Sequence, residues 1–248
     1  MVTIKRLTSD LISLLFPELC NACGTSLLYH EKLMCIKCLY DLPFTDYHQH
    51  AENRVAKQLW GRVPLNAAMA MLYFRKGAKV QNLIHNLKYH GKTDVGVLLG
   101  KMMGERLRAS IPYQDVDVII PVPLHHKKLK QRGYNQSKFI AIGLAEIMEA
   151  GFNDGNLIRS SFTQSQTKKS RYNRYENMLD VFKITLPEQI SNKHILLVDD
   201  VITTGATLEA CANALLNAGA SKVSIAALAL QNKCCRPLAP FATTLTFL

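Results

Sequence analysis

Along most of this 248-residue chain, apolar segments of strand length alternate with segments of helical periodicity. The strand-like segments are apolar at almost every position, which is typical of strands covered on both faces, as in parallel sheets. We therefore predict an α/β fold with a mostly parallel sheet and helices on both of its faces. The predicted strands are 67–74, 116–124, 194–200 and 222–230, and the predicted helices are 52–59, 78–91, 96–109, 137–148 and 207–218.

Two strand ends are candidates for ligand binding. In open parallel sheets, ligands bind outside the carboxyl ends of the strands. The strand at 116–124 ends in Pro121, Val122 and Pro123, and the strand at 194–200 ends in Asp199 and Asp200. The rule therefore points to these two segments.

The second of these strand ends, in the run "HILLVDDVITTGATLEA" (194–210), carries the strongest chemical signal. Two adjacent carboxylates can accept hydrogen bonds from a sugar cis-diol or hold Mg²⁺ through water. The hydroxyls and backbone N–H groups that follow lie at the start of a predicted helix, where the helix dipole favours an anion. Acids and turn together are typical of a ribose 5-phosphate site, and its candidate residues are Asp199, Asp200, Thr203, Thr204, Gly205, Ala206 and Thr207. The alternative is a threonine-capped helix that happens to follow two acids.

Four of the seven cysteines form two Cys-x-x-Cys pairs, and they are Cys20, Cys23, Cys35 and Cys38. Two such pairs supply four thiolates to a tetrahedral Zn²⁺, a closed structural site with no open position for catalysis. Free thiols, a knuckle without metal and an Fe–S cluster are the alternatives, and the even spacing favours zinc. We predict two domains: residues 1–52, with an amphipathic helix followed by the zinc-binding cysteines, and residues 53–248.

The charge of the chain bears on its partners. A net charge of +11 implies nucleic acid, a phosphorylated metabolite or an anionic membrane, unless the basic surface serves solubility alone. The N-terminal apolar run is interrupted by Asp10 and is not followed by the small residues of a cleavage site, so it is not typical of a signal peptide. No stretch approaches the ~20 apolar residues of a membrane span. With thiols that suit a reducing compartment, these features predict a cytoplasmic protein.

A third of the Lys and Arg residues lie in two segments without acids, 125–138 and 159–175. In one interpretation these cations neutralise a departing pyrophosphate. In another they follow the backbone of a single nucleic-acid strand, while tyrosines stack on its bases; the third interpretation is a solvated surface. The candidate cations are Arg132, Lys168, Lys169, Arg171 and Arg174, and the candidate tyrosines are Tyr134, Tyr172 and Tyr175.

Two further motifs are less specific. In "QRGYNQS" (131–137), Asn135 and Ser137 either belong to a site or cap the helix that follows. Lys88 and Tyr89 come at the end of the helix predicted at 78–91, and we assign no function to them from the sequence.

The run "ILLVDDVITTGAT" resembles the phosphoribosyl pyrophosphate (PRPP) binding motif of type I phosphoribosyltransferases. The order of motifs resembles that of the ComF family of competence-associated proteins: cysteine pairs, "LKYHG", "PVPLHHKKLKQRGYNQS", "TQSQTKKSRYNRYENM" and then this run. The resemblance implies that Asp199 and Asp200 contact ribose hydroxyls and that Thr203 to Thr207 hold the 5-phosphate. It further implies a pyrophosphate loop at Pro121 to Pro123, a closing loop at 163–177 and Mg²⁺ bound with PRPP.

Two functions are consistent with these features. In the first, a protein of ComF type binds PRPP or a nucleotide containing ribose 5-phosphate and handles incoming single-stranded DNA in natural transformation, with other DNA-uptake proteins as partners. In the second, an active phosphoribosyltransferase releases pyrophosphate and transfers the sugar to an acceptor that no segment identifies. The fold alone cannot separate them, because function depends on the site.

Overall fold

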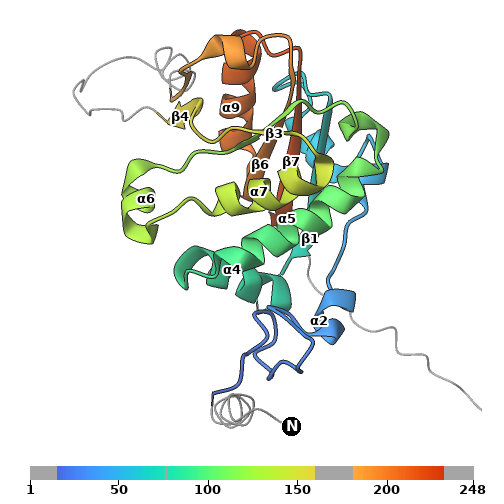
Figure 1. Cartoon of the computed structure of the whole chain (residues 1–248). Helices are drawn as coiled ribbons and strands as arrows, with labels where there is room; N and C mark the ends of the chain where they lie inside the picture. Colours follow the sequence, from blue (N-terminus) through green and yellow to red (C-terminus); the bar gives the residue numbers. More distant parts are fainter. Residues whose placement is uncertain (1–15, 76, 160–180, 232–248) are drawn as a thin grey trace, which may run out of the picture.

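The computed structural model describes residues 16–75, 77–159 and 181–231. Its centre is one parallel sheet whose strands differ in length (Figure 1). The strand order is β1-β7-β6-β2-β3, and every neighbouring pair is parallel. The predicted α/β fold is therefore confirmed. The five strands are β1 (Ala67–Phe74), β2 (Val118–Pro121), β3 (Gly151–Phe152), β6 (His194–Ile202) and β7 (Lys222–Gln231), and a separate antiparallel pair consists of β4 (Leu157–Arg159) and β5 (Phe182–Ile184).

The strand β2 is shorter than the predicted segment 116–124. Proline has no N–H to donate to a sheet, and two of them, Pro121 and Pro123, flank the end of β2. The strand β6 is longer than predicted, because its pairing with β7 continues past the two acids to Ile202. Both acids of the motif are thus part of the sheet.

Helices cover both faces of the sheet (Figure 1). One apolar cluster joins Leu196 of β6 to Leu83 and Ile140, and the other joins Leu197 to Leu208 and Val55. Since successive strand residues point to opposite faces, α4, α5 and α7 cover one face, and α3 and α9 cover the other. The helices are α2 (Ile36–Tyr40), α3 (Arg54–Leu59), α4 (Lys79–Tyr89), α5 (Thr93–Arg108), α6 (His126–Arg132), α7 (Gln136–Met148) and α9 (Ala206–Asn217), with short 3₁₀ turns at Tyr47–Gln49, Ile111–Tyr113 and Pro187–Gln189.

The helices α5 and α7 approach each other at backbone distance. A Cβ atom at Gly100 would lie 2.1 Å from the carbonyl oxygen of Ile140, and one at Gly143 would lie 2.1 Å from that of Val97. Only glycine fits at such a contact. This close packing fixes α7, and with it the N-terminal end of α7 that enters the site described below.

The N-terminal cysteine segment packs on the same core as the sheet. Cys20, Met34 and Cys38 belong to the apolar cluster that contains Leu83. Asn82 of α4 also donates a hydrogen bond to the carbonyl oxygen of Ala22 at 2.8 Å. The division of the chain near residue 52 stays a prediction, and the amphipathic helix expected within residues 1–15 lies outside the described residues.

At the amino end of β6, a buried histidine connects two strands and a loop. The ring nitrogens of His194 lie 2.8 Å from Asp115 Oδ1 and 2.8 Å from Ser224 Oγ. The order serine, histidine, aspartate is that of a hydrolase triad, but Ser224 is fully buried and cannot reach a substrate. The cluster therefore holds the start of β6 in place. Across the described parts of the chain, we find no helix with the length and apolarity needed to traverse a bilayer.

Candidate functional site

The two acids of the motif lie at the carboxyl end of β6, and both contact the N-terminal end of α7. Asp199 pairs with Ala227 in the ladder, and its charge adds to the effect of burial in raising the pKa of Cys211 in α9. Asp200 lies on the face of α4 and α7 and is 5% exposed. The two carboxylates therefore share α7 as a neighbour, and each has further contacts of its own.

Asp200 is held by a cation and an amide. Lys88 Nζ of α4 lies 2.7 Å from Asp200 Oδ2, and Gln136 Nε2 of α7 donates to the same oxygen at 2.7 Å. The side chains of Lys88 and Asp200 are 19% and 8% exposed, so this ion pair is largely shielded from water. We assigned no function to Lys88 from the sequence, and the structure places it in the candidate site. The short motif "LKYHG" is the signal that contained it.

Asp199 is held by two hydrogen bonds, whereas Asp200 also has an ion pair with Lys88. Its Oδ1 accepts hydrogen bonds from Ser137 Oγ at 3.1 Å and from the backbone N–H of Asp200 at 2.8 Å. Burial and the neighbouring charge of Asp200 raise the pKa of Asp199 to about 7, against the lowering effects of its hydrogen bonds and of Lys88. Asp199 is therefore the acid whose protonation changes near neutral pH.

Ser137 and Asn135 have different roles. The side chain of Asn135 accepts the N–H of Ser137 at 3.1 Å and so caps α7, while its amide donates to the carbonyl oxygen of Val122 at 2.9 Å. Ser137 instead contacts Asp199. Of the two alternatives left open by the sequence, Asn135 is the cap and Ser137 belongs to the site.

The turn after β6 opens directly into α9. Gly205 is the N-cap residue of α9, with φ of 75°, a left-handed conformation that favours glycine. The threonines beside it, Thr203, Thr204 and Thr207, are exposed, and Ala206 is the first residue of the helix. The first N–H groups of a helix have no partner within it, so this turn presents donors and hydroxyls to solvent.

Gln58 and Arg62, two residues that the sequence did not indicate, donate hydrogen bonds to the turn. Gln58 Nε2 donates to the carbonyl oxygen of Thr203 at 2.9 Å, and Arg62 Nη1 donates to that of Thr204 at 2.9 Å. Arg62 also pairs with Glu209 of α9. These contacts give both carbonyl oxygens a hydrogen-bond donor, and in the turn itself the N–H of Ala206 lies 3.5 Å from Thr204 Oγ1.

The segment predicted as a pyrophosphate loop lies next to the acids. Pro121 of β2 is the register partner of Val198, and the N–H of Val122 donates to the carbonyl oxygen of Val198 at 2.8 Å. Pro123 follows, where the chain leaves the sheet. The two strand ends that the sequence indicated are therefore neighbours in space.

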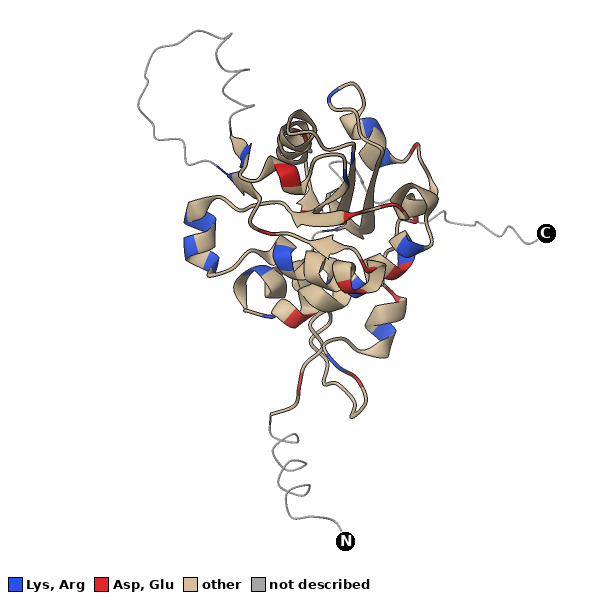
Figure 2. Cartoon of the chain, turned by 45° about the horizontal axis from the view of Figure 1, so that its top comes forward, with Lys and Arg blue, Asp and Glu red and all other residues tan. Residues whose placement is uncertain are grey.

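The first basic segment forms α6, a helix with no buried residue and no acid (Figure 2). Arg132, at its end, donates from Nη1 to Gln136 Oε1 at 2.8 Å. Tyr134 is turned inward, since its hydroxyl donates to the carbonyl oxygen of Leu87 and its ring meets Phe139 edge-on. The predicted base-stacking role of Tyr134 does not fit this orientation. The remaining residues of the basic and aromatic interpretation lie outside the described residues, and they are Lys168, Lys169, Arg171, Tyr172, Arg174 and Tyr175.

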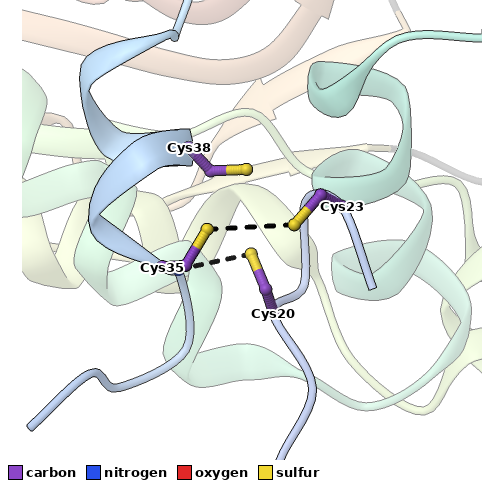
Figure 3. A group of neighbouring side chains, drawn as sticks. All are labelled: Cys20, Cys23, Cys35 and Cys38. Carbon is purple, nitrogen blue, oxygen red and sulfur yellow. Dashed lines mark hydrogen bonds between the residues drawn. The ribbon is translucent and has the colours of Figure 1, made fainter. Parts of the chain in front are cut away.

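The four N-terminal cysteines converge on one point (Figure 3). Their Sγ atoms all lie within 4.8 Å of one another, and those of Cys23 and Cys35 are 3.8 Å apart. A tetrahedral zinc with Zn–S bonds of ~2.3 Å has sulfur–sulfur edges of ~3.8 Å, so the arrangement fits that metal. Hydrogen bonds from Thr25 lower the pKa of Cys23 to about 6, and burial raises the pKa of Cys38. The cluster could hold a metal ion, and no catalytic position is left in a four-cysteine shell.

A cavity of about 600 Å³ lies away from these residues, at the start of β1. Its lining includes Tyr47, His48, Asn66 and Tyr113, and none of the predicted site residues. The acids and the turn thus lie in a different place from this cavity.

Comparisons with known proteins agree with the motifs. A model described as "Phosphoribosyl transferase domain" matches residues 140–240. The chain is 28% identical over 211 residues to "DNA utilization protein YhgH" of Escherichia coli, covering 84% of this chain and 88% of that protein. With the protein of the same name in Salmonella typhimurium the identity is 31%, and the match spans 63% of that protein's length. "Competence protein F" of Haemophilus influenzae is 31% identical over 114 residues, which is 46% of this chain and 50% of that protein.

Homologues of the chain thus include proteins named for DNA utilization and for competence, and part of the chain matches a phosphoribosyltransferase domain. Among solved structures, the chain is similar to a glutamine PRPP amidotransferase from B. subtilis in complex with ADP and GMP. The TM-score is 0.42 and the identity 21%, and the match covers 58% of this chain and 30% of that one. These similarities agree with the motif order along the chain and with the cysteine cluster in front of the sheet.

Proposed function

We propose that this chain is a ComF-family protein and that it binds PRPP, or a nucleotide that contains ribose 5-phosphate, at the carboxyl ends of β6 and β2. The observation that carries the proposal is the continuous segment in which a strand ends in Asp199 and Asp200 and passes through the Gly205 turn into α9. In this proposal the turn binds the 5-phosphate, since its donors and the helix dipole favour an anion.

The two acids divide the contacts to the sugar. Lys88 already neutralises Asp200, so we assign the first ribose hydroxyl to Asp199, whose ionised carboxylate is an acceptor. Mg²⁺ bound with PRPP would add positive charge between the acids and the pyrophosphate. We further assign the pyrophosphate to the loop Pro121 to Pro123 and to the basic residues Lys168, Lys169, Arg171 and Arg174.

Isothermal titration with Mg-PRPP tests this binding. The wild type should release heat on binding, and Asp199→Asn should weaken the affinity. Glu52→Gln is a matched control, because it also turns an acid into an amide at an exposed position away from the turn. A wild type that gives no heat, or an Asp199→Asn variant that binds as well as Glu52→Gln, would contradict the proposal.

A second candidate function, the handling of single-stranded DNA in natural transformation, is favoured by α6. This helix exposes Lys127, Lys128 and Lys130 without a neighbouring acid in its own sequence. The names of the similar proteins, competence protein F and DNA utilization protein, support a role in the handling of DNA. We propose that this role is carried out in the cytoplasm together with other DNA-uptake proteins.

A mobility shift assay across a salt series tests the second function. For single strands, each phosphate contact contributes about 0.7 to the slope of log affinity against log salt, so removing three lysines of α6 should reduce the slope by about 2. A control variant that replaces three exposed lysines elsewhere should keep the slope, and suitable positions are Lys32, Lys37 and Lys57. An unchanged slope in the α6 variant would exclude α6 as the contact surface.

A further inference from the structure

An exposed tyrosine stands at the rim of the candidate site. Tyr89 is the last residue of α4 and is 56% exposed, whereas the apolar side of that helix is buried. One helical turn earlier, His85 is exposed as well, and the two ring centroids are 4.9 Å apart. A single exposed tyrosine needs no explanation, so its surroundings decide whether it is a site.

The feature that distinguishes Tyr89 is an arginine from another part of the chain. The guanidinium carbon of Arg132 lies 5.2 Å from the centroid of the Tyr89 ring, and its Nη2 lies 3.5 Å from the Tyr89 hydroxyl. Within the described part of the chain, the buried Nε of Arg132 has no hydrogen-bond partner. Arginine binds the π-face of aromatic groups and bases, and it is seldom left with an unsatisfied group.

This pair is connected to the acid site by a closed ring of contacts. Lys88, next to Tyr89, reaches Asp200 at 2.7 Å; Gln136 reaches the same carboxylate at 2.7 Å; and Arg132 reaches Gln136 at 2.8 Å. The side chain of Lys88 thus points into the site while that of Tyr89 lies at its edge. A ligand whose sugar contacts the acids would have its next group within reach of the tyrosine and the arginine.

We propose that Tyr89 and Arg132 form a stacking site for a nucleobase. This inference rests on the proposed function, because it takes the acids and the turn as the place of the ribose 5-phosphate. A base attached to that sugar would stack on Tyr89, with the guanidinium of Arg132 adding a cation–π contact. The ligand class of the site is then a base-bearing nucleotide, free or at the end of a strand, in addition to PRPP, which has no base.

Titrations with three ligands separate this inference from the proposed function. The ligands are Mg-PRPP, GMP and a 5′-phosphorylated deoxythymidine oligonucleotide. Tyr89→Leu removes the ring, and Tyr89→Phe is the matched control that keeps it. Base–aromatic stacking contributes ~1–3 kcal/mol, so Tyr89→Leu should weaken the binding of a base-bearing ligand by about 5- to 150-fold, while Tyr89→Phe should bind like the wild type.

The affinity for Mg-PRPP in Tyr89→Leu should stay within about two-fold, and thermal unfolding should show that both variants are folded. A loss for GMP identifies a free nucleotide as the source of the base, and a loss for the oligonucleotide alone identifies a strand. Equal losses for all three ligands, or no loss for either base-bearing ligand, would overturn the stacking site. If Mg-PRPP fails to bind the wild type, the proposed function fails, and the other two ligands still test Tyr89.

Discussion

The pair Lys88–Asp200 is the contact that holds α4 to the carboxyl end of the sheet, and its energy can be measured. Replacing Lys88 by Met keeps much of the apolar side chain and removes the cation 2.7 Å from Asp200 Oδ2. Breaking a buried ion pair by removing one partner costs ~3–5 kcal/mol, because the other charge is left uncompensated. Gln136 still donates to the same oxygen, so we expect about 3 kcal/mol, near the lower end.

Urea unfolding gives this number directly. With a slope of ~2–3 kcal/mol per molar urea, the midpoint should fall by roughly 1–1.5 M. Lys101→Met is the matched control: Lys101 also lies on a helix and has a close partner, Glu146 at 2.6 Å, but the two side chains are 38% and 57% exposed. Such exposed pairs contribute ~0–1 kcal/mol.

A double variant, Lys88→Met with Asp200→Asn, removes both charges and should be more stable than the sum of the two single changes predicts. If Lys88→Met costs no more than Lys101→Met, or if the two single effects add, then Asp200 does not depend on Lys88 and the account of this pair is wrong.

Three further predictions concern the acid, the turn and the cysteines. Between pH 4 and 7, Asp199 should bind more protons in the folded than in the unfolded chain, since folding raises its pKa from 3.8 to about 7. The contribution of Asp199 to stability is therefore present at low pH and is lost as the pH rises. In urea unfolding, the stability of Asp199→Asn minus that of the wild type should be larger at pH 8 than at pH 5. In urea unfolding, Gly205→Ala should lower the free energy of unfolding by ~1–2 kcal/mol or more, because the backbone there is left-handed and a Cβ would lie 2.9 Å from Leu59 Cδ2. The control Gly155→Ala, where a Cβ has open space, should leave the free energy of unfolding unchanged. Metal analysis of the purified protein should find about one zinc per chain, absent from a Cys35→Ser/Cys38→Ser variant, and a metal-free wild type would refute the zinc site.

The parts of the fold and site that could be predicted from the sequence are those coded by neighbouring residues. The strand β1 has the predicted bounds because it is an unbroken apolar run, and the turn at Gly205 follows from a local motif. The cysteine cluster was predictable for the same reason, because the spacing of the two pairs determines which thiolates meet.

The parts that could not be predicted depend on contacts between distant segments. Lys88 looks like an ordinary helix-end lysine until the fold brings it to Asp200, and Gln58 looks like a solvated side chain until it reaches the carbonyl oxygen of Thr203. The helix α6 was missed because it buries no residue and so has no apolar stripe. The contacts of the two acids with α7 also depend on the tertiary fold, because Gln136 and Ser137 are distant in sequence from Asp200 and Asp199.

Hydrogen exchange in the presence of Mg-PRPP tests the central claim most directly, because it reports which backbone amides a ligand covers. The account predicts slower exchange in the segment 203–208, where the turn and the first residues of α9 would donate to the 5-phosphate, and unchanged exchange in the cysteine segment 20–38. Binding of Mg-PRPP that leaves the amides of 203–208 unprotected would contradict it.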